Sequence, residues 1–289
     1  MTDIIYLLVI AIPVIISMIL VFGSPKRRST RVSRIVFLTA VFIFTYLPIF
    51  VLVVFSFNSG RSTGVWEGFS LKWYEELIND DRIKSALLTT VIVALSSALI
   101  STVFGTVSAI GIFYMKKIPK NIVMNITNIP ILNADIITGV SLLLLYNILG
   151  IPLGYASLIL AHISFNIPYV ILSVMPKLKQ MDNNIYEAAL DLGATPTRAL
   201  VNVIVPQIMP GIVSGFLLSL TMSMDDFVIS LFTSGPVVST LSLEIYSMTK
   251  RGITPEINAL STIIFVVVIA VLLITNMRNS DSKGKKRKA

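Results

Sequence analysis

The sequence predicts an all-α, polytopic membrane protein. Of its 289 residues, 55% are hydrophobic and only 13% are charged, which is too apolar for an ordinary soluble domain. The apolar residues form several stretches, most of them long enough to cross about 30 Å of hydrocarbon as a helix. Lys and Arg gather beside these stretches, as membrane orientation signals do. Cysteine is absent, which excludes disulfides, thiolate metal sites and cysteine catalysis.

We expect seven membrane spans, at residues 4–22, 35–55, 87–115, 122–149, 155–175, 208–232 and 259–275. Most of the 23 Lys and Arg residues lie in the four segments inferred to be cytoplasmic, whereas the two longer outer loops carry nearly balanced charge. Because cytoplasmic flanks are enriched in Lys and Arg, the N-terminus is predicted outside and the C-terminus inside. This placement accounts for the net charge of +8 without nucleic acid as a partner.

The predicted domain organisation has three parts. Residues 1–34 form an extra N-terminal transmembrane helix and a basic cytoplasmic linker, residues 35–276 form the main transmembrane domain, and residues 277–289 form a basic cytoplasmic tail. No basic residue precedes the first apolar stretch and no small-residue cleavage site follows it, so we interpret it as a retained helix and not a signal peptide. The outer stretch 69–77, FSLKWYEEL, is either a short interfacial helix or an ordinary solvated loop.

Residues 184–206 form the one long polar, helix-competent stretch between apolar spans, within a cytoplasmic loop at 182–206. Asn184 stands three residues before Glu187, a capping-box spacing in which each side chain satisfies a free amide of the first turn. A helix is therefore expected to begin at Asn184. Such a segment gives another protein a place to act on a membrane protein.

Gly193 is expected to end this first helix, because glycine adopts the positive φ of a helix C-terminus without strain. Thr195 followed by Pro196 is the pattern of an N-cap with proline at the first helical position. The second helix is expected to stop at Pro206, because proline lacks an amide hydrogen and its ring clashes with the preceding turn. The stretch therefore predicts a helix, a sharp turn and a second helix.

Three aspartates are the only charged residues within the predicted spans: Asp135, Asp225 and Asp226. A charge at membrane depth is costly unless it faces water or protein, so the first hypothesis for each is a role in a substrate path. No Lys or Arg of this chain lies in a span to pair with them. A cation in the path, a neighbouring subunit or protonation would have to balance them. The alternative is that they cap a helix break or bind backbone amides.

The positions of these aspartates predict different depths. If the span 122–149 is a regular helix, Asp135 lies about 20 Å from either end, near mid-membrane. This span also contains proline and asparagine, and irregular backbone survives at such depth only where protein or water satisfies it, so we expect it to line a cavity. Asp225 is expected toward the outer mouth. Adjacent helical residues point about 100° apart, so at least one of Asp225 and Asp226 would face the path while the other can anchor structure.

The polar segment resembles the EAA loop of ABC importer permeases. The match consists, in order, of Glu187, Ala188, Ala189, Gly193 and Pro206 at the spacing of that motif. Valine stands where the motif has isoleucine and leucine before the final proline. The resemblance implies that the loop docks in a cleft of a cytoplasmic ATPase. Glu187 would then hold the start of the docking helix, Gly193 would permit its turn, and the two alanines would allow close approach.

Over a longer range, roughly residues 36–275, the sequence resembles the permeases of spermidine/putrescine importers, the PotC type. The resemblance is carried by SFNSGRSTGVWEGFSLKWYEEL, SLLLLYNILGIPLGYASLILAHISFNIPYV, EAALDLGA, and SMDDFVISLFTSGP followed by IYSMTKRGITPEINAL. It implies a type I importer domain of six core helices in the bacterial cytoplasmic membrane, surrounded by lipid. The departure from this family is the extra helix at residues 4–22.

The same resemblance implies three kinds of partner: a second permease subunit (PotB type), a pair of cytoplasmic ATPases (PotA type) and an extracytoplasmic polyamine-binding protein (PotD type). The sequence contains neither GxxxxGK[ST] nor GxGxxG, so ATP and Mg²⁺ would be bound by the ATPases, and no cofactor is expected on this chain. Polyamines are polycations, and a path whose only fixed charges are carboxylates suits them.

Other functions stay open at this point. One is an ABC permease for another solute, such as iron or thiosulfate, although anionic cargo fits poorly with aspartates in the spans. A second is a proton-coupled secondary transporter that uses Asp135, Asp225 and Asp226 as relays. A third is a receptor or scaffold, which leaves the aspartates unexplained. An enzyme is the least expected. His162, the only histidine, is interpreted as a packed residue, with a proton relay as the alternative.

Overall fold

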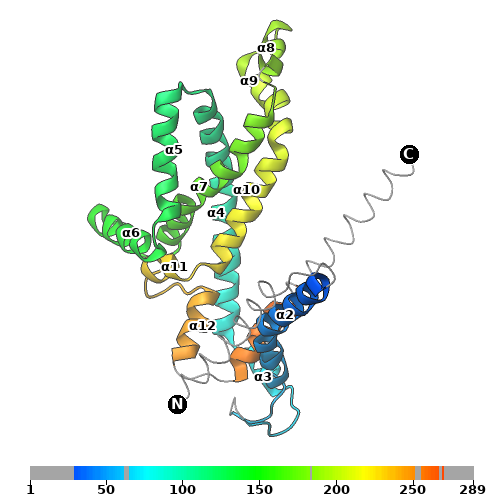
Figure 1. Ribbon diagram of the computed structural model, residues 1–289. Coiled ribbons are helices and arrows are strands. Elements are labelled where there is room, and N and C mark those ends of the chain that lie inside the picture. The colour runs from blue at the N-terminus through cyan, green and yellow to red at the C-terminus, as the bar shows by residue number, and fades with distance from the viewer. Residues whose placement is uncertain (1–28, 62–64, 183, 251–254, 267–268, 270–289) are drawn as a thin grey trace. The chain divides into compact units, whose positions relative to one another are not determined.

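The computed structural model describes residues 29–61, 65–182, 184–250, 255–266 and 269 (Figure 1). These residues are almost entirely helical, and the isolated β-bridge recorded among them joins Asn58 and Phe69. The prediction of an all-α protein is confirmed. The first predicted span and the basic C-terminal tail lie outside the described residues.

The chain divides into two compact units. The first combines residues 1–79 with residues 252–289, and its described helices are α2 (Ser29–Phe55), α3 (Lys72–Asn79) and Pro255–Val266. The second comprises residues 80–251 and contains α4 (Asp81–Tyr114), α5 (Lys117–Leu132), α6 (Asp135–Leu149), α7 (Tyr155–Gln180), α8 (Asn184–Asp191), α9 (Pro196–Ala199), the π-helix η1 (Leu200–Ile204), α10 (Val205–Asp225), α11 (Val228–Thr233) and α12 (Leu241–Lys250).

Four described helical stretches are long and apolar enough to cross a membrane: Ile35–Phe55, Asp81–Tyr114, Tyr155–Gln180 and Pro196–Asp225. Helices α5 and α6 pass the same test as a pair, which raises the number to five if the bent pair is one span. The shorter apolar helix Pro255–Val266 covers the beginning of the predicted last span. A multi-pass membrane protein is therefore confirmed, with fewer spans among the described residues than the seven expected from the whole sequence.

In the first unit, the loop after α2 is held by the side chain of Asn58. Its Nδ2 donates to the carbonyl oxygen of Val65 at 2.7 Å, and its Oδ1 accepts from the amide of Glu67 at 2.8 Å. Trp73 donates its Nε1 hydrogen to the Asn58 carbonyl oxygen at 2.6 Å, and its ring is 2% exposed. Trp73 and Leu77 form the buried face of α3. Of the two alternatives for residues 69–77, a short helix is present from Lys72 to Asn79, and its place in a membrane interface stays a prediction.

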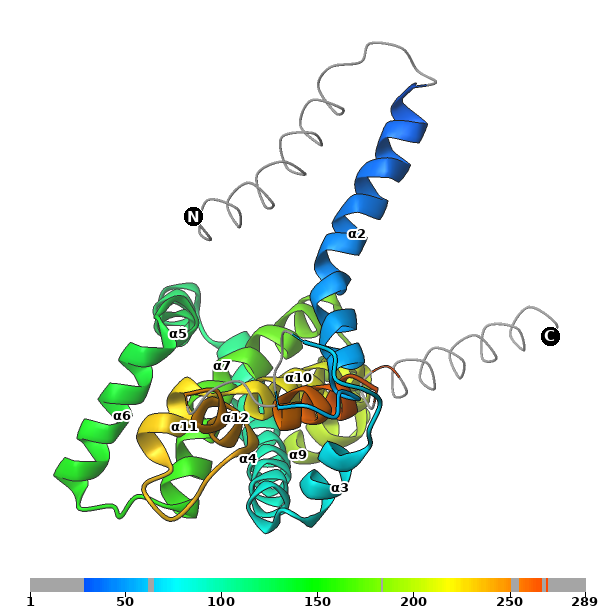
Figure 2. The same ribbon diagram turned by 90° about the horizontal axis from the view of Figure 1, so that it is seen from below.

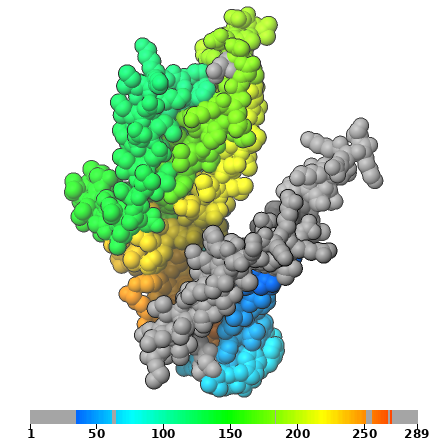
Figure 3. All heavy atoms as spheres, in the orientation of Figure 1, coloured from blue at the N-terminus to red at the C-terminus, as the bar shows by residue number. Residues whose placement is uncertain are grey.

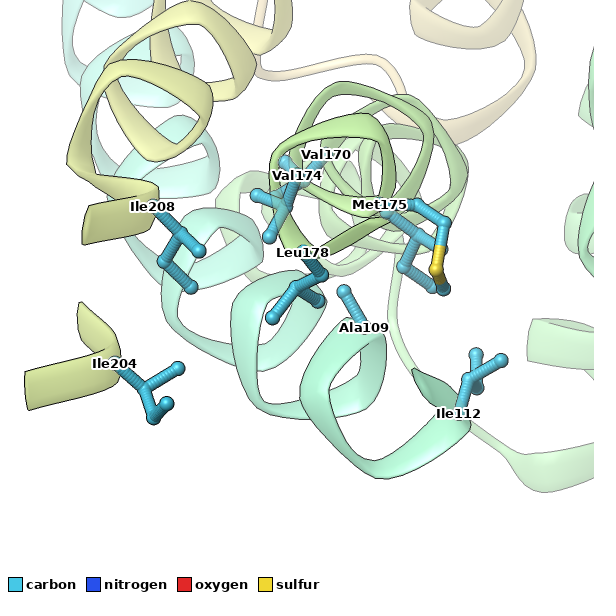
Figure 4. Close-up of a cluster of buried hydrophobic side chains, with 9 residues drawn as sticks. Ala109, Ile112, Val170, Val174, Met175, Leu178, Ile204 and Ile208 are labelled. Atoms are coloured by element: carbon cyan, nitrogen blue, oxygen red, sulfur yellow. The ribbon is translucent and has the colours of Figure 1, made fainter. Parts of the chain in front are cut away.

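In the second unit, α4, α7 and α10 pack side by side along most of their length (Figure 1). One apolar cluster between them is shown in Figure 4 and contains Ala109, Ile112, Val170, Ile171, Val174, Met175, Leu178, Ile204 and Ile208. Small residues permit the close approach. A Cβ added at Gly105 would lie 2.6 Å from Val170 Cβ, and one at Gly211 would lie 3.1 Å from the Ser173 carbonyl oxygen. Such contacts are how membrane helices gain packing energy that lipid cannot supply.

The depth inferred for Asp135 was conditional on a regular helix over residues 122–149, and this condition is not met. Helix α5 ends at Leu132, α6 begins at Asp135, and the two helices are bent by 104° (Figure 2). At the break the backbone of Asn133 and Ala134 is extended, with ψ 150° and 137°. The mid-membrane depth inferred for Asp135 assumed a regular helix and does not hold.

Candidate functional site

The polar segment 184–206 lies at one end of α10, where α8 and α9 form a projecting tip (Figure 3). Helix α8 begins at Asn184, as predicted, but the cap is different. The carboxylate of Asp182 accepts a hydrogen bond from the Asn184 amide at 3.0 Å, and the Asp182 carbonyl oxygen accepts one from Ile185 at 3.2 Å. Asp182, and not a capping box of Asn184 with Glu187, therefore begins the helix.

The turn after α8 forms at Gly193 with φ +85°, as predicted. The Gly193 amide donates to the Leu190 carbonyl oxygen at 2.9 Å, and the Ala194 amide donates to the Ala189 carbonyl oxygen at 3.1 Å. These two bonds are the Schellman pattern of helix termination, which satisfies the free carbonyls and places one residue in the left-handed region. An added Cβ at Gly193 would meet nothing within 4 Å, so backbone conformation alone favours glycine here.

The predicted stop at Pro206 is wrong. Thr195 caps α9, accepting from the Arg198 amide at 3.4 Å, but the chain then stays helical through η1 into α10. In η1 the Val205 amide bonds to the Leu200 carbonyl oxygen, one residue further back than in an α-helix. Pro206 follows within the first turn of α10. The wider π-turn accommodates the proline ring, which in a regular α-helix clashes with the carbonyl oxygen of the preceding turn.

Exposed side chains gather on this segment. Glu187 and Ala188 are exposed and Ala189 is half-buried. Leu192 is 90% exposed, the highest value among the large apolar side chains that the structure describes. Leu192 was missed by the sequence reasoning, although its place beside the predicted turn glycine could have marked it. The arrangement offers a partner the carboxylates of Glu187 and Asp191 on a short helix and one apolar side chain in the turn that follows it.

At the other end of α10, the two adjacent aspartates have different surroundings. Asp225 is the last residue of α10 and is exposed. The side chain of Asp226 is 8% exposed and accepts hydrogen bonds from the Ile229 amide (3.2 Å), the Ser230 amide (2.7 Å) and the Ser230 hydroxyl (2.8 Å). Asp226 thus caps α11, which was the alternative role considered for these residues.

His162 is fully buried on α7, consistent with a packed residue. Its Nε2 lies 3.2 Å from the Ser230 hydroxyl and 3.5 Å from the Asp226 carboxylate. Its ring also meets Phe165 edge to face, with centroids 5.4 Å apart. The histidine therefore belongs to the surroundings of Asp226 and has no direct contact with Asp225 among the described interactions.

Asp135 is exposed in the first turn of α6 and makes no side-chain cap bond there. No described hydrogen bond or ion pair joins Asp135 to Asp225 or Asp226. Helices α6 and α11 nevertheless pack together, and a Cβ added at Gly139 would lie 2.8 Å from the Phe232 ring.

Two further observations concern charge. Among the described residues, no group of three or more His, Cys, Asp and Glu side chains could hold a metal ion. Outside the membrane-spanning helices, hydrogen bonding to the Arg82 side chain lowers the pKa of Asp80, the N-cap of α4.

Comparisons with known proteins agree on one kind of transporter. Residues 101–281 match the family model for the binding-protein-dependent transport system inner membrane component. The spermidine/putrescine transport system permease protein PotC of Escherichia coli (strain K12) is 39% identical over 255 residues, covering 88% of this chain and 97% of the relative. The putrescine transport system permease protein PotI of the same organism is 39% identical over 242 residues, covering 81% and 86%.

A solved structure shares the fold. It is the crystal structure of a bacterial ABC transporter involved in the import of the acidic polysaccharide alginate, with a TM-score of 0.65 at 15% identity. The match covers 89% of this chain and 99% of that chain. At this identity the likeness concerns architecture alone.

The conformation of the α8–α9 turn gives a local prediction. Gly193→Ala is expected to cost about 1 kcal/mol or more, because an L-residue is strained at positive φ. Faster hydrogen exchange at the amides of Gly193 and Ala194 would report the loosened turn by mass spectrometry. Gly111→Ala is the control, since an added Cβ there meets nothing within 4 Å and no positive φ is involved. Equal exchange in the two variants at the turn would contradict the prediction.

Proposed function

We propose that this chain, which belongs to the family of binding-protein-dependent transport system inner membrane components, is the permease subunit of an ATP-driven polyamine importer. The observation that carries the proposal is the 39% identity to a spermidine/putrescine permease over 88% of the chain. Membership of the family accounts for the several apolar helices. The polar segment 184–206 at one end of α10 is assigned to a partner in this proposal and is called the docking segment below. It makes the chain a transport subunit and not an enzyme.

The cargo is inferred from charge as well as from the relatives. Asp135 and Asp225 are exposed carboxylates at helix ends of the membrane domain, and no Lys or Arg lies within the predicted spans. Spermidine and putrescine carry ammonium groups that need charge compensation while they leave water. Two separated carboxylates would lower that cost stepwise without holding the cargo permanently. In this proposal both residues line the translocation path.

The partners are a second permease subunit, two ATPase subunits that bind ATP and Mg²⁺, and an extracytoplasmic binding protein. We assign docking of an ATPase to the segment 182–206, with Glu187 presented on α8 and Leu192 in the turn that follows it. This assignment puts the segment and the C-terminus in the cytoplasm and the N-terminus outside. The positive residues beside the spans support that orientation.

The geometry supports a mechanism of coupling. The helical stretch Pro196–Asp225 has 30 residues, which corresponds to about 45 Å at 1.5 Å per residue. The docking segment lies at its beginning and Asp225 is its last residue. When an ATPase moves the segment, the stretch would move as one element and displace Asp225 at the far end. Alternating access through tilting of packed helices requires such a connection.

Reconstitution into lipid vesicles tests the proposed function. The chain, a second permease subunit and the ATPases are expected to accumulate radiolabelled spermidine only when ATP and the binding protein are both supplied. The isolated chain is expected to transport nothing with or without a proton gradient. Uptake by the isolated chain would instead support the proton-coupled carrier, and uptake of thiosulfate or iron in place of spermidine would reassign the cargo.

Neutralising the path aspartates tests the route of the cation. Asp225→Asn and Asp135→Asn are each expected to reduce spermidine uptake about tenfold or more, since a hydrogen bond to a charged group contributes about 1.5–3 kcal/mol. Binding-protein-stimulated ATP hydrolysis should persist, because assembly does not involve these residues. Asp81→Asn is the matched control, with a side chain 95% exposed at the start of α4. Unchanged uptake in both path variants would remove this route.

Removal of the docking carboxylate tests coupling. Glu187→Ala is expected to abolish transport-linked ATP hydrolysis or to release the ATPases, as measured by co-purification and by phosphate release. Asp191→Ala removes an equally exposed carboxylate from the same helix and should have a smaller effect. Full assembly and full uptake in Glu187→Ala would exclude this role.

A further inference from the structure

Buried polar side chains of α4, α7 and α10 are hydrogen-bonded to one another near the break between α10 and α11. Asn166 Nδ2 donates to the Ser223 hydroxyl at 2.7 Å, and Ser223 is 3.1 Å from the hydroxyl of Ser97 on α4. Ser97 itself donates to the Ala94 carbonyl oxygen at 3.3 Å, which leaves Ser223 as the donor to Ser97. Helices α4, α7 and α10 are thus joined by one directed chain of hydrogen bonds.

The same helix α7 also holds the other side of the break. His162 and Asn166 are four residues apart and share one face of α7. Asn166 contacts Ser223 in the last turn of α10, and His162 contacts Ser230 in α11. Of these four residues Ser223 is 4% exposed and the other three are 0% exposed. The two side chains of α7 therefore contact the last turn of α10 and the first turn of α11.

The hydrogen-bond pattern shows which ring nitrogen of His162 donates to the Ser230 hydroxyl. The Ser230 hydroxyl donates to the Asp226 carboxylate at 2.8 Å, so it can only accept from His162. The Nε2 atom of His162 must then carry the hydrogen. Nδ1 has no hydrogen-bond partner among the described residues. The contact to α11 is therefore made through Nε2 alone, which makes it separable from the packing of the ring.

We infer that His162 and Asn166 are positioning residues, which hold the ends of α10 and α11 so that Asp226 turns inward and Asp225 is presented to the cation. Asp225 and Asp226 are adjacent at the break between α10 and α11. The carboxylate of Asp225 is exposed, whereas that of Asp226 is hydrogen-bonded to α11. We call the contacts of His162 with Ser230 and of Asn166 with Ser223 the clamp. Loss of the clamp would let α11 loosen and would misplace Asp225. The inference rests on the proposed function for its consequence in transport, but its structural part is independent of the cargo.

Isosteric substitutions at His162 provide the test. The amide nitrogen of Gln reaches the place of Nε2, whereas that of Asn reaches only the place of Nδ1. His162→Gln is therefore expected to keep the contact to Ser230, and His162→Asn is expected to lose it. Because both replacements remove the aromatic packing on Phe165, a difference between them does not come from the loss of the ring.

Cysteine labelling reads out the state of the break, since the natural chain contains no cysteine. Ile229 is 2% exposed in α11, so Ile229→Cys should react slowly with a charged methanethiosulfonate in membrane vesicles, while Asp225→Cys should react readily. In the His162→Asn background Ile229→Cys is expected to react at least tenfold faster, and in the His162→Gln background it should stay protected. Equal reactivity in the two backgrounds would overturn the inference.

Transport kinetics separate this inference from the proposed function. His162→Asn is expected to raise the KM for spermidine about tenfold in the assembled importer, with a smaller rise in His162→Gln. If no variant or parent takes up spermidine, the proposed cargo fails while the labelling result still decides the positioning role. If Ile229→Cys behaves as expected and KM is the same in both variants, the link from the clamp to Asp225 is wrong.

Discussion

A helix that breaks at membrane depth frees backbone groups that no solvent can satisfy, and the structure depends on how these groups find partners. At the break after α10 the partner is one carboxylate. Asp226 accepts from the amides of Ile229 and Ser230, which are among the free donors at the start of α11. The carboxylate in turn needs neighbours of its own, and the Ser230 hydroxyl and the imidazole of His162 supply them. Asp226 therefore has a structural role as the cap of α11, whereas the exposed Asp225 remains available to a cation in the proposed function.

The opposite end of α10 also departs from a regular α-helix. There the chain carries a proline, yet it remains helical because the π-turn of η1 shifts the bonding of Val205 by one residue. A stop at Pro206 would have separated the docking segment from α10 by a flexible joint. Continuity instead makes Pro196–Asp225 one helical stretch. Its rigidity depends on close packing against α4 and α7, where glycine and alanine allow the helices to approach.

Local features of this chain could be predicted from the sequence, and features that depend on distant contacts could not. Gly193 and Thr195 act within one or two turns, so their spacing was sufficient to predict the turn and the second cap. The spacing of Asn184 and Glu187 predicts a capping box, whereas the Asn184 amide donates to the carboxylate of Asp182, two residues earlier.

The roles of the aspartates needed the tertiary structure. Composition marked Asp225 and Asp226 as unusual, but their contrast arises from a helix break and from His162, which is 64 residues away in the sequence. The depth inferred for Asp135 depends on a regular helix, and the extended backbone of Asn133 and Ala134 interrupts that helix. Charge and hydropathy patterns report what a residue costs at membrane depth, and only packing reports which neighbour compensates it.

The two exposed carboxylates differ in what they offer a cation. Asp135 lies in the first turn of α6, where the positive end of the helix dipole stabilises the anion and offsets part of its charge. Asp225 lies in the last turn of α10, where the dipole is negative and the final carbonyl oxygens have no helical partner. A cation at Asp225 therefore gains from the carboxylate, the dipole and the free carbonyls together. In a path that uses both residues, Asp225 would compensate an ammonium group more strongly than Asp135.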